Sequence, residues 1–194
     1  MERSIRYHKG SYTVTIPPEI INRIGLKGGD ILEFNIDSNG FFACPKTCSN
    51  QREVYTIGYE GRTLSQFINL LKINNIRQII DVREIAFSRK SGFSKSALEK
   101  GLKSNDIIYR HCPQLGTPKE IRESYYQTHN FSLLAEMFEK HFIESEAKEI
   151  LFDVIGLAIV RKSALMCYEL LPSKCHRSLI AKKMASEGFQ VVNL

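Results

Sequence analysis

Short apolar strands alternate with helical stretches from Val54 to the end of the 194-residue chain. Strands that are separated by helices pair side by side in parallel, and the helices then cover both faces of the sheet. The pattern therefore predicts an α/β domain with a largely parallel sheet over residues 54–194. We expect strands at 54–57, 78–81, 107–110, 164–167 and 191–194, and helices at 63–71, 95–102, most of 131–160 and 178–186.

Residues 1–46 follow a different, β-rich pattern. An alternating strand stops at Pro17-Pro18, a turn of helix follows, and two more strands flank the turn Ser38-Asn39-Gly40. A segment of this size buries too little surface to be stable alone, so we expect it to pair with a second copy. Polar residues 47–53 are the expected linker. The expected elements are strands at 12–16, 31–36 and 41–44 and a helical turn at 19–24.

The stretch Gly10-Ser-Tyr-Thr-Val-Thr-Ile-Pro-Pro-Glu-Ile-Ile-Asn-Arg-Ile-Gly-Leu-Lys-Gly-Gly-Asp30 resembles the AbrB/MazE/SpoVT swapped-hairpin family. The resemblance implies an intertwined homodimer that binds DNA through basic residues near the first strand and the turn. The corresponding residues of this chain are Arg3, Arg6, His8, Lys9 and Arg23. Acidic residues nearly balance basic residues in this segment. DNA binding therefore requires the basic side chains to cluster on one face. The alternative is a dimerisation module whose charges are solvated.

Composition limits where the protein is expected to reside and what it is expected to bind. No apolar stretch approaches the roughly 18–20 residues that cross a bilayer, and the N-terminus lacks a secretory signal, so we expect a cytoplasmic protein without a membrane partner. Five cysteines, an odd number without paired spacing, indicate reduced thiols. A net charge of +6 permits binding to DNA or another polyanion.

Several expected strands end in charged or nucleophilic residues. The carboxyl ends of parallel strands meet at one edge of the sheet, where α/β proteins bind their ligands. Structural alternatives exist: Asp81 and Arg83 can pair with each other, His111 can be a core histidine, and Cys167 can be a small buried hydrophobe. Together, however, the residues predict a site. They are Gly58, Asp81, Arg83, His111, Cys167 and Glu169.

Cys175-His176-Arg177 opens the last expected helix. Unpaired backbone N–H groups at a helix start favour an anion, and Arg177 can add a bidentate grip on phosphate or carboxylate. The positive end of the helix dipole, together with a protonated His176, lowers the pKa of Cys175. This thiol is therefore a candidate nucleophile or redox sensor. The alternative is a plain helix cap with exposed His176 and Arg177.

Spacing excludes several common chemistries. Neither Cys167 nor Cys175 begins the C-x5-R motif of cysteine-dependent phosphatases, and the chain has no Walker loop and no G-x-G-x-x-G. A zinc site from these cysteines and His176, with Cys112 or His111, is conceivable. The C-x7-C spacing matches no usual ligand pattern, so the sequence predicts no metal and leaves the cofactor open.

Five ordered motifs over residues 54–194 resemble the family catalogued as domain of unknown function 488. The resemblance implies an α/β fold and places the site at the motif residues, but it brings no activity. One departure is Glu84-Ile-Ala86, where the family commonly has a proline. The motifs are Tyr55-Thr-Ile-Gly-Tyr-Glu-Gly-Arg, Ile-Ile-Asp81-Val-Arg83, Tyr109-Arg-His111-Cys-Pro-Gln-Leu-Gly116, Leu165-Met-Cys167-Tyr-Glu169 and Cys175-His176-Arg177-Ser-Leu-Ile.

These observations give one main hypothesis and two alternatives. The main hypothesis is a DNA-binding, regulatory homodimer whose α/β domain binds an anionic or nucleotide-like ligand, with thiol chemistry as an added option. Its roles are acid/base or ribose contact for Asp81 and Glu169, anion binding for Gly58, Arg83 and Arg177, proton donation for His111 and His176, and nucleophile for Cys167 or Cys175. The alternatives are an enzyme acting on nucleic acid or nucleotides, in which the N-terminal segment only dimerises, and a redox or metal sensor.

Overall fold

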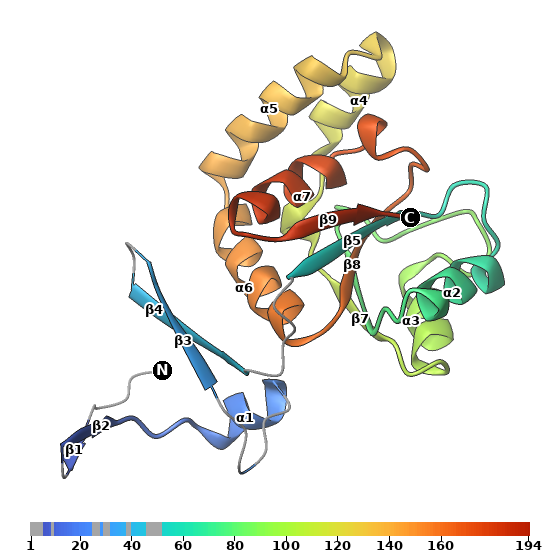
Figure 1. Ribbon diagram of the computed structural model, residues 1–194. Helices are drawn as coiled ribbons and strands as arrows, with labels where there is room; N and C mark the ends of the chain where they lie inside the picture. The colour runs from blue at the N-terminus through green and yellow to red at the C-terminus, as the bar shows by residue number, and fades with distance from the viewer. Residues whose placement is uncertain (1–5, 9, 25–27, 29–31, 38–39, 46–51) are drawn as a thin grey trace. The chain divides into compact units, whose positions relative to one another are not determined.

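The computed structural model describes residues 6–8, 10–24, 28, 32–37, 40–45 and 52–194 (Figure 1). The chain divides into two compact units, residues 1–48 and 49–194, and each unit is described by itself. Most of the linker expected at 47–53 lies outside the described residues, and the first strand of the second unit begins at its end, at Glu53.

The first unit contains two antiparallel hairpins and one short helix. β1 (Arg6–His8) pairs with β2 (Ser11–Thr13) around Gly10, whose positive φ of 84° suits glycine in a tight turn. β3 (Leu32–Asp37) pairs with β4 (Gly40–Pro45). Between the hairpins, α1 (Pro18–Ile24) begins at a proline, whose fixed φ suits the first helical position.

The first hairpin differs from the expectation. The strand expected at 12–16 ends at Thr13, and β1, which was not expected, precedes it. A strand requires a hydrogen-bonded neighbour, and the short β1 offers one only over residues 11–13.

The second unit is built on a five-stranded sheet in which every neighbouring pair of strands is parallel. This confirms the predicted α/β class. The pairing register sets Gly58 beside Cys167 and sets Asp81 between His111 and Met166, so these strand ends share one edge. In spatial order the strands are β7 (Ile108–His111), β6 (Gln78–Asp81), β8 (Ser163–Cys167), β5 (Glu53–Gly58) and β9 (Gln190–Asn193).

Helices cover both faces of the sheet (Figure 1). α2 (Leu64–Ile73), which begins at a capping box formed by Thr63 and Gln66, and α3 (Lys95–Lys103) pack on one face in the main apolar core. α7 (Arg177–Ser186) and α6 (Ala147–Val160) lie on the other face, and α7 contacts β5, β8 and β9.

Two helical features were not predicted. The stretch 131–160 is two helices, α5 (Phe131–Glu144) and α6, and an additional helix, α4 (Lys119–Thr128), packs against α5. The sequence of α4 has no strong apolar stripe, since Ile121 is its main buried residue, and so periodicity did not indicate this helix. Two 3-10 turns, η1 (Pro113–Leu115) and η2 (Pro172–Lys174), complete the unit. Within the described part of the chain, no helix combines the length and the apolar character needed to span a membrane.

Candidate functional site

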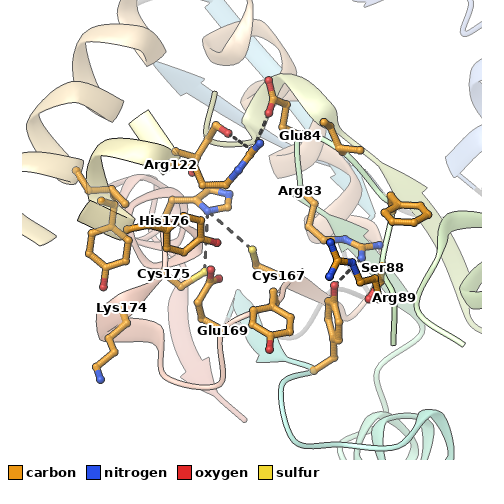
Figure 2. A pocket seen from close by; sticks show the side chains of 18 residues that line it. Arg83, Glu84, Ser88, Arg89, Arg122, Cys167, Glu169, Lys174, Cys175 and His176 are labelled. Atoms are coloured by element: carbon orange, nitrogen blue, oxygen red, sulfur yellow. Dashed lines mark hydrogen bonds and ion pairs between the residues drawn. The ribbon is translucent and has the colours of Figure 1, made fainter. Parts of the chain in front are cut away.

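A cavity of about 440 Å³ opens beside the carboxyl ends of β6 and β8 (Figure 2). The loop after β6, helix α4, the end of β8 and the residues before α7 supply its walls. Its most buried wall consists of Cys167, Cys175 and His176, with Glu169 beside them. The predicted meeting of strand ends and the last helix start therefore occurs, but only some of the predicted residues reach the cavity.

His176 points one ring nitrogen at both cysteines. Its Nδ1 lies 3.9 Å from Sγ of Cys167 and 4.0 Å from Sγ of Cys175, as the dashed lines in Figure 2 show. The other nitrogen, Nε2, lies 2.8 Å from the carbonyl oxygen of Val82. Because a carbonyl only accepts, Nε2 carries the hydrogen of a neutral ring and Nδ1 presents its lone pair to the sulfurs.

The thiols and the imidazole shift one another's proton affinity. Burial would raise the pKa of Cys175, but hydrogen bonds from Cys167 and His176 lower it well below its ordinary value. The pKa of Cys167 is raised by its hydrogen bond to Cys175 and by burial. The pKa of His176 is raised, because its contact with Cys175 outweighs the lowering by burial. These shifts favour loss of a proton from Cys175 rather than from Cys167.

Glu169 adds an unsatisfied carboxylate to this wall. Burial, and secondarily the nearby Cys175, raises the pKa of Glu169 to about 7. Its Oε2 atom is buried and accepts no hydrogen bond from the described residues. A buried acceptor without a partner is uncommon in folded proteins and marks a place where a ligand, an ion or a water is expected to bind.

Arg177 and Gly58 hold the loop that carries Glu169. The Arg177 side chain is 0% exposed and donates to the carbonyl oxygens of Glu169 and Leu170. A Cβ on Gly58 would overlap the Glu169 carbonyl and lie 2.9 Å from Cα of Leu170, so only glycine permits this approach. Neither residue lines the cavity, so the geometry differs from the predicted anion-binding roles. The first helical position points this guanidinium inward, toward backbone carbonyls.

Asp81 and Arg83 form a buried ion pair, which is the structural alternative considered for them. The Asp81 carboxylate accepts hydrogen bonds from Nε and Nη2 of Arg83 at 2.8 and 2.6 Å, and from the Tyr109 hydroxyl at 2.7 Å. Nη1 of Arg83 donates to the Tyr59 hydroxyl and the Phe93 carbonyl. Although Arg83 borders the cavity, most of its donors are therefore committed within the protein.

His111 also supports the loop after β6. Its Nε2 lies 2.8 Å from the carbonyl oxygen of Arg83, and the residue does not line the cavity. Thus Cys167, Glu169, Cys175, His176 and one edge of Arg83 face the cavity. The other predicted residues of the α/β domain, Gly58, Asp81, His111 and Arg177, lie behind it.

Several cavity residues were not among the predicted site residues. Arg122 of α4 binds Glu84 at 2.7 Å and the Thr117 carbonyl at 2.8 Å, which places α4 along the rim. Aromatic and basic side chains supply the rest of the wall, and the adjacent pair Tyr125-Tyr126 was the available sequence signal. The remaining aromatic residues are Tyr59, Phe87 and Tyr168, and the remaining basic residues are Arg89 and Lys174.

The DNA-binding residues predicted in the first unit are only partly described. Arg6 is exposed on β1. His8 lies on β1 and Arg23 on α1, whereas Arg3 and Lys9 lie outside the described residues. Their gathering on one face stays a prediction.

The fold and the site define an α/β protein with a cysteine–histidine cavity, preceded by a small unit of hairpins. A family model described as "Domain of unknown function DUF488" matches residues 63–184, which is more than half of the chain, and the chain belongs to this family. A second model, "Antidote-toxin recognition MazE, bacterial antitoxin", matches residues 8–46. Both resemblances inferred from the sequence are confirmed. Comparison with curated proteins and with solved structures gave no match.

Proposed function

We propose that this protein is a DNA-binding, regulatory homodimer whose α/β domain binds an anionic, nucleotide-like ligand in the cavity beside His176. The observation that carries the ligand proposal is the composition of the cavity wall, in which aromatic faces and basic side chains surround a buried polar centre. The MazE-like match over residues 8–46 suggests a DNA-binding or regulatory function and supports the remainder.

Three aromatic side chains around the cavity are open to a ligand. Phe87 is 70% exposed, Tyr126 57% and Tyr168 44%. Aromatic faces stack on nucleobases of any sequence, and each stacked base contributes about 1–3 kcal/mol to binding. Large exposed aromatics that converge on one cavity favour a planar ligand over a purely aliphatic one.

Basic side chains at the same cavity favour an anion. Arg89 and Lys174 line it, and neither forms an ion pair with a carboxylate of the described residues. Their charge is therefore available to a phosphate group, whereas Arg122 is already paired with Glu84. An aromatic platform with cations beside it matches the two parts of a nucleotide.

The ligand proposal is tested by calorimetric titration of the full chain with nucleoside mono- and diphosphates. We expect Lys174→Ala and Tyr168→Ala each to weaken binding about 5- to 10-fold, which corresponds to roughly 1–1.4 kcal/mol. Lys103→Ala, an exposed substitution on α3 outside the cavity, is the matched control. Absence of binding by any nucleotide, or equal losses in all three variants, would count against the proposal.

The DNA proposal is tested by electrophoretic shift of mixed duplex DNA at about 50 and 200 mM salt. We expect binding that weakens steeply at the higher salt, and weaker binding by Arg6→Ala. Light scattering after size exclusion should give twice the chain mass of 22.2 kDa. A monomer, or an intact protein that shifts no DNA at the lower salt, refutes this part.

A second candidate function is thiol-dependent catalysis on a nucleotide or nucleic acid, with the first unit serving only to dimerise. The position of Cys175 Sγ 4.0 Å from Nδ1 of His176 favours it, because a neighbouring imidazole can take the proton of an attacking thiol. Cleavage, deamination or base release that is lost in Cys175→Ser but retained in Cys112→Ser would establish it. Turnover that survives Cys175→Ser would exclude it.

A further inference from the structure

We propose that Cys167, Cys175 and His176 bind a zinc ion, with a fourth coordination position that opens toward the cavity beside Glu169. Both cysteines are free and buried. Two thiolates and one imidazole are ligands that zinc prefers, and three protein ligands with one open position are typical of catalytic zinc. This site shares the cavity with the proposed ligand but does not require that ligand.

The spacing of the three ligand atoms fits a tetrahedral ion. Their donor atoms all lie within 4.8 Å of one another. Zinc bonds of about 2.3 Å to sulfur and about 2.05 Å to nitrogen separate S from N by about 3.6 Å and S from S by about 3.8 Å. The observed distances from Nδ1 to the sulfurs, 3.9 and 4.0 Å, need only a small contraction, whereas the two sulfurs, which lie within 4.8 Å of each other, would have to approach by up to about 1 Å.

The histidine is oriented as metal-bound histidines usually are. Its Nδ1 faces the sulfurs, and Nε2 donates to the carbonyl oxygen of Val82 at 2.8 Å. Ligating histidines commonly donate their second N–H to a backbone carbonyl, which fixes the tautomer and the ring plane. The ring is 6% exposed, so it has little freedom to turn away.

Charge and hydrogen bonding support the same assignment. Two thiolates and a neutral imidazole neutralise Zn²⁺ in a wall where an isolated charge would be costly. Oε2 of Glu169 lacks a donor among the described residues. A water at the fourth zinc position would donate a hydrogen bond to it, and zinc would make that water more acidic.

Sequence spacing hid this cluster. Cys167 and Cys175 have seven residues between them, and His176 directly follows the second cysteine, so no usual zinc pattern is present. The turn η2 folds the intervening chain back, and the last residue of β8 then lies opposite the residue that caps α7. The prediction of no metal rested on linear spacing alone, whereas the fold brings the ligands together.

The test uses the full chain, purified in reductant without a chelator or a metal-affinity tag. Elemental analysis should find about one zinc per chain, retained in Cys112→Ser, whose thiol is buried elsewhere. Cys167→Ser and Cys175→Ser should lose more than about 100-fold in zinc affinity, because loss of an outer-sphere partner alone costs 10- to 100-fold. Cobalt substitution should give thiolate-to-cobalt charge-transfer bands and the intense visible bands of a tetrahedral site.

Each outcome decides the proposal. If wild type, folded by circular dichroism, takes up neither Zn²⁺ nor Co²⁺, the metal assignment is wrong, and rapid alkylation at Cys175 would then identify a free thiol. If the serine variants do not fold, the cobalt spectrum of wild type still decides, because charge-transfer bands require thiolate ligands. Nucleotide titration of zinc-free protein keeps a failure here separate from a failure of the ligand proposal.

Discussion

Replacement of Asp81 by alanine should strongly destabilise the α/β unit, because it breaks a buried ion pair from one side. Asp81 is 0% exposed and Arg83 is 6% exposed. The carboxylate accepts from the backbone N–H, Nε and Nη2 of Arg83 and from the Tyr109 hydroxyl. In Asp81→Ala the guanidinium stays buried without a counter-charge, and the Tyr109 hydroxyl loses its acceptor.

Removal of one partner from a buried pair costs about 3–5 kcal/mol, whereas an exposed pair contributes about 0–1 kcal/mol. For a unit of this size each kcal/mol lowers Tm by about 2–4 °C, so Tm should fall by about 6–20 °C. The matched control is Glu123→Ala. The Glu123 carboxylate lies 3.7 Å from Lys119, and the two side chains are 58% and 68% exposed, so its loss should cost less than about 1 kcal/mol.

Urea denaturation followed by circular dichroism measures both variants against wild type. The double variant Asp81→Ala with Arg83→Met removes the stranded charge and should recover part of the loss. The pair does not stabilise the fold as argued if the free energy of unfolding of Asp81→Ala lies within about 1 kcal/mol of the wild-type value. The same conclusion follows if Asp81→Ala unfolds at no lower urea concentration than Glu123→Ala.

Three further changes probe residues that do not line the cavity. Gly58→Ala would place Cβ 2.6 Å from the carbonyl carbon of Glu169 and should cost about 3 kcal/mol or more. Its control, Gly156→Ala, meets nothing within 4 Å and should stabilise α6 by about 0.5–1 kcal/mol. Equal urea midpoints for the two variants would contradict this prediction. Arg177→Met removes the donor to the Glu169 carbonyl and should cost about 2–4 kcal/mol, which a wild-type melting temperature would disprove. Burial raises the pKa of Cys112 from 9.0 to about 11, so the stability of the neutral thiol is fully present below pH 9 and lost as pH rises through 11. Between pH 8 and 11, wild type should therefore lose about 2 kcal/mol more than Cys112→Ala in urea denaturation, and parallel losses would argue against it.

The sheet was predictable because its strands are short apolar runs bounded by turn residues. β6 was predicted with the bounds that the structure shows, and the other strands of the α/β unit agree to within one or two residues. The shared edge was predictable for the same reason, since parallel pairing brings carboxyl ends together. Helix α4 was not predictable from periodicity, because it is held by packing against α5.

Residue types alone did not show which polar side chains at this edge of the sheet face the cavity and which are paired within the protein. A guanidinium at a helix start suits an anion, yet Arg177 turns to two backbone carbonyls seven and eight residues earlier in the chain. Asp81 and Arg83 have the chemistry of a site but satisfy each other. Which polar groups remain open depends on where their neighbours' backbones run, and that is a property of the fold.

The order of the strands also affects how the chain folds during synthesis. β5 is made first in its unit, but its two neighbours in the sheet, β8 and β9, are made last. At about 5–20 residues per second, β5 waits on the order of ten seconds on the ribosome before either partner emerges. The hairpins of the first unit have that whole interval to form. If the proposed dimer assembles through them, nascent chains on one message would associate before any cavity exists. Ribosome profiling of assembling chains would reveal such early pairing.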